Sequence, residues 1–394
     1  MMLMSSDIPF NERVLKWARE WQGRSYEQAA KKAGVTAERI IQWEAGEAKP
    51  TVRQARLLAD AYERPFLEFF SPEIPSVRRS ELVPDFRLYQ EAPEPAESRE
   101  LIHIQEWAES QRLNALDLFD LLAEKAPSFP QTLFATLSDR PEAIAAMARE
   151  TIGFPVSEQM NKSVADRDRL PGKLRSRFEA LGVLVLKHSG LKKLRARGIC
   201  IFYPSLPIIV FANEAPAAQA FTLVHELAHI IMRKSAVIGE VYQPMGPTDI
   251  ARTERWCDQF AAAFLVPADV LAEHRSRPIR PAERISDDEL KSLAAEFGVS
   301  RHAMLIRLVE LGYVHKDFYW KIKRAQFKAE EASYEAHGRA SYYASRYRSA
   351  CGDLYTGLVL EAWATGRITN HNACEFMGIK NLAHLNAVRD HFVD

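Results

Sequence analysis

Apolar positions in the first seventy residues recur with the period of short amphipathic helices. The spacing predicts four helices, over residues 10–22, 26–33, 37–44 and 52–62. Ser25 and Thr36 are typical helix N-caps, and Gly34 supplies a permissive turn between the second and third helices. The N-terminal segment is therefore predicted to be a small helical bundle.

The pattern changes further along the chain. Residues 71–98 hold five prolines and no helical period, which is typical of a linker. Helices are predicted at 100–125, 139–151 and 173–181, and short β-branched runs at 183–186, 199–203 and 207–212 predict a small sheet. After Ala217 the pattern is helical almost to the end. The expected fold class is mainly α with a small β-sheet (α+β). The expected domains are residues 1–72, a linker 73–97, a central domain 98–318 and a C-terminal helical domain 319–394.

Composition narrows the function classes. The 394 residues include 52 Lys+Arg and 52 Asp+Glu, so a globally basic nucleic-acid binder is excluded, whereas a locally basic module is not. No run of 18 apolar residues occurs, which argues against a membrane-spanning helix. The four cysteines lie far apart and form no CxxC pair, as expected for a reducing cytosol. We therefore expect a cytoplasmic protein without a membrane partner.

The second and third predicted helices have the layout of a DNA-binding helix-turn-helix. The third helix would present Ala37, Glu38, Arg39 and Gln42 to the major groove, where Arg pairs with guanine and Gln with adenine. Arg24 and Lys49 are candidates for phosphate contacts. Because residues 1–70 hold eleven Lys+Arg and ten Asp+Glu, the electrostatic footprint is weak, and a bundle without a DNA role stays open.

The segment FTLVHELAHIIM, residues 221–232, contains an HExxH motif. His225 and His229 are four residues apart and project from one helix face, as a single Zn²⁺ ion requires. Glu226 lies beside the first histidine, where a general base for water is needed. The flanking positions are apolar almost all round, which predicts a buried helix. Two histidines and a glutamate in a buried helix are unfavourable unless they bind a ligand such as a metal ion.

A catalytic zinc needs a third protein ligand. Downstream, Glu254 and Asp258 are again four residues apart on a largely apolar helix. Glu254 is the expected ligand, with Asp258 as the hydrogen-bond partner of a ligating histidine. Asp258 as the ligand, with Glu254 exposed, is the alternative. Cys257 points away from the Glu254 direction by about 60° and is expected to be a small core residue.

Two family resemblances follow from these motifs. The string from Ser25 to Tyr62, with its ending Trp43-Glu44-x-Gly46-x-x-x-Pro50, resembles the Xre/Cro-type helix-turn-helix family. Glu38 departs from the small or amide residues common at that base-facing position. The HExxH segment followed by ERWCDQFAAAFLVP resembles the ImmA/IrrE family of metallopeptidases, over roughly residues 78–315, and its Glu-x-x-x-Asp spacing resembles gluzincin-type peptidases. Asn often stands in that family where this chain has Asp258.

The resemblances imply a DNA-binding transcriptional regulator with a zinc-dependent endopeptidase domain that cleaves a repressor or antitoxin-like protein. The alternative is a DNA-binding repressor or antitoxin whose peptidase-like domain serves sensing or dimerisation with little proteolysis. A homodimer on a two-fold duplex site is expected, because one small module makes few base contacts. The strand at 207–212 is expected to offer an edge to an extended substrate. Tyr203 and Tyr242 are candidate oxyanion stabilisers.

Overall fold

The computed structural model describes residues 10–62, 64–74, 95–160, 163–194, 196–238, 249–274, 284–332 and 343–393. The chain divides into two compact units, Met1–Leu82 and Val83–Asp394. Most of the expected linker lies outside the described residues, as does Tyr242. In the part of the chain that is described, no helix is long and apolar enough to cross a membrane.

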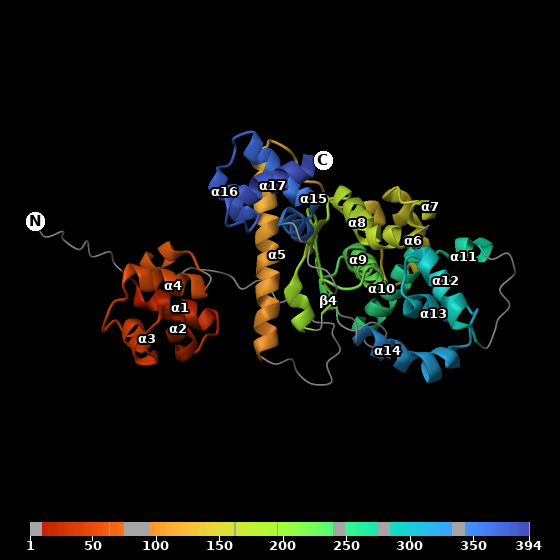
Figure 1. Ribbon diagram of the computed structural model, residues 1–394, viewed down its shortest axis with the longest axis horizontal. Coiled ribbons are helices and arrows are strands. Elements are labelled where there is room, and N and C mark those ends of the chain that lie inside the picture. The colour runs from red at the N-terminus through yellow and green to blue at the C-terminus, as the bar shows by residue number, and fades with distance from the viewer. Residues whose placement is uncertain are drawn as a thin grey trace, which may run out of the picture. The chain divides into compact units, whose positions relative to one another are not determined.

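The first unit is a bundle of short helices (Figure 1). Its elements are α1 (Glu12–Trp21), α2 (Tyr26–Ala33), α3 (Ala37–Glu44), α4 (Val52–Tyr62) and the 3₁₀ helix η1 (Phe66–Phe70). Ser25 and Gln28 form a capping box that starts α2, and Gly34 ends it with a left-handed φ of 69°. Thr36 precedes α3, but its side chain makes no cap hydrogen bond. Local side-chain and glycine caps therefore account for both ends of α2.

The second unit contains a four-stranded sheet. Its strands are β1 (Leu184–Lys187), β2 (Gly198–Ile201), β3 (Ile208–Phe211) and β4 (Ala236–Ile238), in the order β1-β3-β2-β4. β3 runs parallel to β1 and antiparallel to β2, and β4 is antiparallel to β2. The expected edge strand at 207–212 is therefore wrong, because β3 lies between β1 and β2. The edge next to β2 is β4, a strand that the sequence pattern did not indicate.

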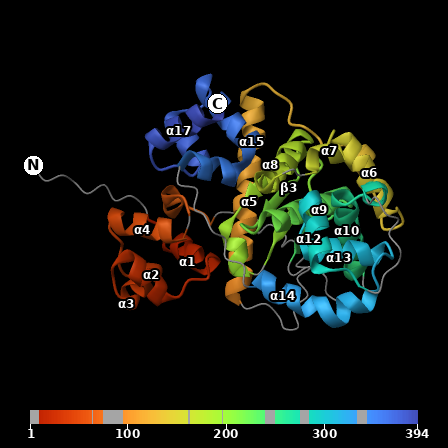
Figure 2. The same cartoon turned by 45° about the vertical axis from the view of Figure 1, so that its right-hand side comes forward.

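Helices surround this sheet (Figures 1 and 2). They are α5 (Pro95–Leu121), α6 (Pro141–Thr151), α7 (Val156–Gln159), α8 (Val164–Ala180), α9 (Pro216–Ile231), α10 (Asp249–Leu265), α11 (Ala268–His274), α12 (Asp287–Phe297), α13 (Arg301–Glu310), α14 (Arg324–Ala332), α15 (Tyr343–Ala364), α16 (Asn370–Phe376) and α17 (Leu382–Val393). Short 3₁₀ helices η2 (Gln131–Leu133) and η3 (Ser189–Leu194) and the π-helix η4 (Phe318–Lys323) complete the unit. The expected mainly helical fold with a small sheet is confirmed.

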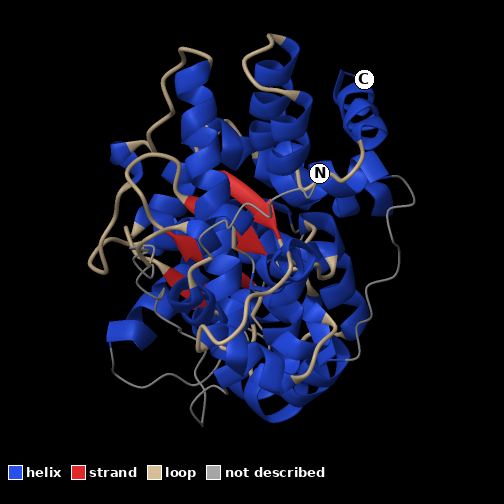
Figure 3. Ribbon diagram, turned by 90° about the vertical axis from the view of Figure 1, so that its left-hand side faces the viewer, coloured by secondary structure: helices blue, strands red, loops and turns tan. Residues whose placement is uncertain are grey.

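The two faces of the sheet carry different hydrophobic clusters, so the strands lie between helical layers (Figure 3). Alternate strand residues point to opposite faces. Val185, Cys200 and Ile209 join the cluster of α6, α8, α9, α10, α12 and α13. Leu186 and Val210 join the cluster of α5 and α15–α17. This arrangement buries all four residues of both β2 and β3 and places α9 directly against the sheet.

The C-terminal helices share the sheet with the rest of the second unit. The kinked α15 contacts β1, α5 and α8, and α16 and α17 pack on α15. Because these helices and the sheet form one hydrophobic cluster, residues 343–393 do not have a core of their own. The separate C-terminal domain expected over 319–394 is therefore corrected to a covering layer of the central unit.

Candidate functional site

Helix α9 carries the HExxH motif through the interior of the second unit. Every residue from Ala220 to Ile231 is buried, because α8 and α10 cover the helix on the sides that the sheet leaves open. His225 is 4% exposed, and Glu226 and His229 are fully covered. Polar side chains in such a place need compensating partners.

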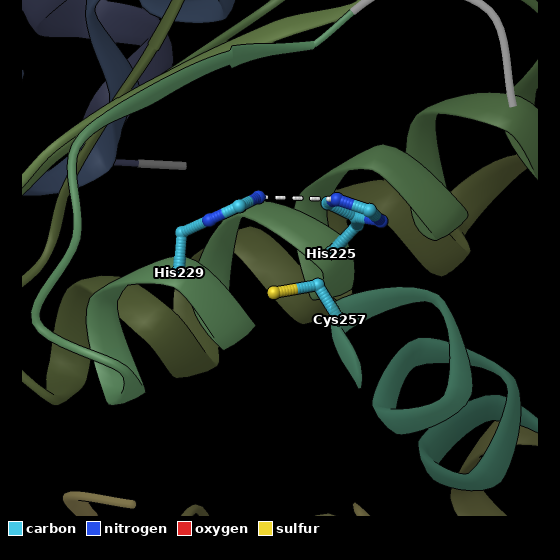
Figure 4. Close-up of side chains that lie close together, drawn as sticks. All are labelled: His225, His229 and Cys257. Atoms are coloured by element: carbon cyan, nitrogen blue, oxygen red, sulfur yellow. Dashed lines mark hydrogen bonds between the residues drawn. The ribbon is translucent and has the colours of Figure 1, made fainter. Parts of the chain in front are cut away.

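The two histidines face each other (Figure 4). Their Nε2 atoms are 3.2 Å apart. Helix α10 adds Glu254, whose Oε2 lies 3.3 Å from Nε2 of His225 and whose Oε1 lies 3.2 Å from Nε2 of His229. Two ring nitrogens and both oxygens of one carboxylate therefore converge, in a place where a cation would satisfy all of them.

The separations within this cluster match a tetrahedral metal ion. Bonds of 2.0–2.1 Å to nitrogen and oxygen place two tetrahedral ligands about 3.3–3.4 Å apart. The distance of 3.2 Å between the two ring nitrogens, and the distances of 3.3 and 3.2 Å from each of them to one oxygen of Glu254, are close to that value. His225, His229 and Glu254 thus fit a zinc ion by both donor chemistry and spacing.

Asp258 lies behind the first histidine. Its Oδ1 is 3.0 Å from Nδ1 of His225, on the side of the ring away from Glu254. Burial opposes protonation, but the hydrogen bonds to Asp258 and Glu254 raise the pKa of His225 to about 10. Burial likewise opposes ionisation of Glu254, yet the two histidines hold its pKa below the usual range. Burial lowers the pKa of His229, so the second imidazole is neutral and can donate a lone pair beside the ionised Glu254.

Glu226 is placed differently from the ligand candidates. Its side chain is fully buried, and neither carboxylate oxygen has a hydrogen-bond partner among the described residues. Burial raises its pKa well above the usual range. The carboxylate lies against β2 at Gly198, where an added Cβ would clash with Oε1. Gly198 was not singled out from the sequence, although a glycine inside a strand indicates a close approach.

Cys257 also faces the histidines (Figure 4). Its Sγ lies within 4.8 Å of a ring nitrogen of each histidine. Cys257 was expected to be a core residue, and it is fully buried. It does not point away from Glu254, because residues three apart on a helix are neighbours on its surface. Burial and the nearby carboxylates raise the pKa of its thiol well above the usual value, which keeps the sulfur protonated in this arrangement.

The candidate DNA-reading side chains lie on α3 and beside it. Glu38 and Arg39 are exposed, Ala37 and Gln42 are half-buried, and Lys49 is exposed after the helix. Nη1 of Arg39 donates to Oε1 of Gln42 at 3.0 Å, so the two are linked on one face. A backbone hydrogen bond at the helix start lowers the pKa of Glu38, which keeps it ionised.

Arg24 is held within the first unit. Its Nε donates to the carbonyl oxygen of Ala61 at 2.7 Å and ties the chain before α2 to the end of α4. We therefore leave it out of the DNA contacts proposed below.

The segment Trp43-Glu44-x-Gly46, which carries the resemblance to the Xre/Cro-type family, fixes the end of α3 in the bundle. Trp43 is 1% exposed in the core, and Gly46 has a left-handed φ of 76°. Glu44 accepts two hydrogen bonds from the buried Arg19 of α1, at 2.6 and 2.8 Å. This charged pair fixes the base of α3 to α1, which leaves the outer face of α3 to other contacts.

The tyrosine proposed for the active site is engaged elsewhere. Tyr203 donates its hydroxyl to Oε1 of Glu109 at 3.1 Å, and Arg112 lies over its ring. Burial raises the pKa of Tyr203 to about 12. These contacts join α5 to the loop before β3 and give the residue a packing role.

Comparisons with protein families give one match in each of the two units. Residues 15–69 match a helix-turn-helix family, and residues 178–309 match a peptidase family described as the IrrE N-terminal-like domain. The second match includes the HExxH helix and the whole of α10. No significant match to a curated protein accompanies these two.

Fold and motifs together define a regulator type in which a DNA-binding domain is joined to a peptidase-family domain. More specifically, residues 15–69 carry an Xre-like helix-turn-helix and residues 178–309 carry an IrrE/ImmA-like peptidase-family domain.

Proposed function

We propose that the peptidase-family domain is a zinc-dependent endopeptidase that cleaves a protein partner, a repressor or an antitoxin-like protein. The convergence of His225, His229 and Glu254 at 3.2–3.3 Å carries this proposal. These three side chains would hold the ion. Asp258 would fix the His225 ring through Nδ1, as carboxylates commonly do behind ligating histidines. When bound, Zn²⁺ polarises a carbonyl and lowers the pKa of water towards about 7.

Glu226 is the general base in this mechanism. A buried carboxylate with a raised pKa accepts a proton from water readily and returns it to the leaving amine. A purely structural zinc site does not require a buried carboxylate without a hydrogen-bond partner beside its ligands, and burying the Glu226 carboxylate costs free energy. This favours catalysis over a domain that serves only sensing or dimerisation.

The substrate strand is assigned to the β4 edge. Gly198, which contacts Glu226, pairs with Ile238 of β4, so the base lies next to the edge of the sheet. An extended peptide that adds to β4 would gain main-chain hydrogen bonds there. The interior position of β3 leaves it no room for such a strand.

The experiment has two parts. Metal analysis of the full chain, purified without chelator, should give about one zinc per chain for wild type and for Glu226→Gln. Incubation with the protein encoded next to this one should yield a discrete cleavage product with wild type only. A metal-free wild type of unchanged fold would overturn the metal centre. Zinc without cleavage of any tested partner would favour the sensing or dimerisation role.

For the first unit we propose sequence-specific binding to duplex DNA as a dimer on a two-fold site. The linked Arg39 and Gln42 on the outer face of α3 support it, because these side chains pair with guanine and adenine edges. Lys49 would contact phosphate. Selection from random duplexes tests the proposal, and the absence of any enriched sequence would leave the unit as a protein-recognition module.

A further inference from the structure

The C-terminal end of α10 is buried and capped from outside the helix. A helix leaves its last carbonyls without partners in its own backbone, so a buried end must find donors elsewhere. Three successive carbonyls here each accept from a different element. Phe264 O accepts from Arg149 Nη1 at 2.8 Å, Leu265 O from Gln159 Nε2 at 2.7 Å, and Val266 O from Arg307 Nε at 2.9 Å. We call these three side chains the α10 cap.

Each member of the α10 cap is itself held by the surrounding helices. Nη1 of Arg149 also donates to Oε1 of Gln159 at 2.7 Å, and Gln159 donates to the carbonyl of Phe297 at the end of α12. Arg307 donates to both oxygens of Glu142 on α6, at 2.6 and 2.9 Å. The cap thus ties the end of α10 to α6, α7, α12 and α13.

Burying two arginines and a glutamine in the α10 cap costs free energy, so stability by itself would not favour these residues. Arg149, Gln159 and Arg307 are 7%, 0% and 2% exposed. A buried guanidinium loses its hydration, and apolar residues of similar volume often stabilise a fold as well or better. The two cations do face the negative end of the α10 dipole, which lowers that cost. Carbonyls that accept directed hydrogen bonds are also fixed in position, which an apolar neighbour would not achieve.

The position of α10 determines the metal centre. His225 and His229 lie on α9, whereas Glu254, Cys257 and Asp258 lie on α10. A slip of α10 by one residue would move its side chains by about 1.5 Å along the axis and about 100° around it. Either change would break the contacts of 3.0–3.3 Å between the two helices.

We propose that Arg149, Gln159 and Arg307 are positioning residues for the metal centre, because they hold α10 in the register that brings Glu254 and Asp258 to the histidines. The identity of the ion rests on the proposed function. The positioning of Glu254 and Asp258 rests on the contacts between α9 and α10.

The first test measures zinc affinity in the full chain by competition with a chromophoric chelator. Gln159→Met keeps the side-chain length, changes no charge and removes the cap to Leu265. We expect it to weaken zinc binding about tenfold or more, as loss of supporting contacts around metal ligands typically does. Arg149→Met should act similarly, and Arg149→Lys, which keeps the charge and a donor, should recover most of the loss.

Arg175 offers a matched control. It is also a buried arginine, 9% exposed, and donates to the carbonyl of Ser349 in α15 at 2.6 Å, outside the α10 cap. Arg175→Met should reduce the free energy of unfolding but leave zinc affinity and the absorption spectrum of the cobalt-substituted protein as in wild type. Equal affinity for wild type and Gln159→Met, or equal losses in the cap variants and the control, would overturn the proposal.

A second readout needs no metal. The Nδ1–H proton of His225, hydrogen-bonded to Asp258, should give a low-field NMR signal in metal-free wild type and in Arg175→Met. We expect this signal to shift or disappear in Gln159→Met and Arg149→Met. An unchanged signal in the folded cap variants would contradict the inference. If wild type binds no zinc, the proposed enzyme fails, while this signal still decides whether the cap positions α10.

Discussion

Helix α3 of the first unit and the α9–α10 pair of the second both present polar side chains in a functional pattern, but in opposite surroundings. On α3, Arg39 is exposed and its only described side-chain partner is Gln42, three residues on. On α9 and α10 the polar groups are buried and meet across two helices at 3.0–3.3 Å. Burial makes each polar group costly in free energy unless it has a partner. The buried side chains are therefore compatible with few ligands, and a metal ion is one of them. An exposed set is compatible with many sequences and many ligands.

The general base should give the largest effect. Glu226→Gln removes the proton acceptor but none of the three ligand candidates, so turnover should fall by about 10²–10⁴-fold or more while zinc content stays the same. Cleavage of a verified partner, followed by gel densitometry, measures the change. Wild-type turnover in this variant would mean that the buried carboxylate has another role.

Substitution of the third ligand should give the next largest effect among the buried side chains. Glu254→Ala should lower zinc affinity at least about 100-fold, because both of its oxygens lie within 3.3 Å of the ring nitrogens. Cys257→Ala should leave zinc affinity within about threefold of wild type, because Glu254 rather than the thiol supplies the proposed third ligand. The reverse result would make the site His-His-Cys.

The partner of His225 should have a smaller effect. Asp258→Ala should weaken zinc binding by about 10–100-fold, because the ring loses the contact that orients it. Asp258→Asn is the matched variant: its amide oxygen still accepts from Nδ1, so we expect a lesser loss. Chelator competition measures both. A loss as large as that of Glu254→Ala would favour Asp258 as a ligand.

The exposed set on α3 should give the smallest single effects. Arg39→Ala and Gln42→Ala should each weaken binding to a selected duplex by about 1–3 kcal/mol. Lys49→Ala should weaken binding to all duplexes about equally and flatten the salt dependence. Titrations of a selected and a scrambled duplex at two salt concentrations distinguish these outcomes. Enrichment that persists unchanged in the Arg39 and Gln42 variants would remove α3 from the readout.

Local sequence features predicted the first unit closely. The expected boundaries of α2, α3 and α4 agree with the structure, because caps and glycine turns act within a few residues. In the second unit the apolar runs located β1, β2 and β3, whereas the three-residue strand β4 was missed. A strand that short has no periodicity to detect, and it exists because β2 offers it a partner.

For the metal centre, too, some features could be predicted from the sequence and others depend on packing. The spacing of His225 and His229 and of Glu254 and Asp258 is a property of single helices, so the sequence was sufficient to pair them. It left open which carboxylate faces both ring nitrogens, because that depends on how α10 crosses α9. The approach of Cys257 and the close contact of Glu226 with Gly198 depend on the same packing.

The sequence alone determined which residues could share a helix face, where the helices of the first unit begin and end, and which side chains are chemically able to hold zinc. Only the tertiary structure decided the interior place of β3, the role of Arg24 as a tie to Ala61, and the cap on α10. Arg149 and Phe264 are 115 residues apart in the chain, and Gln159 and Leu265 are 106 apart. No local pattern encodes such a contact, because it forms only when helices packed on a common core bring buried donors to carbonyls that have no other partner.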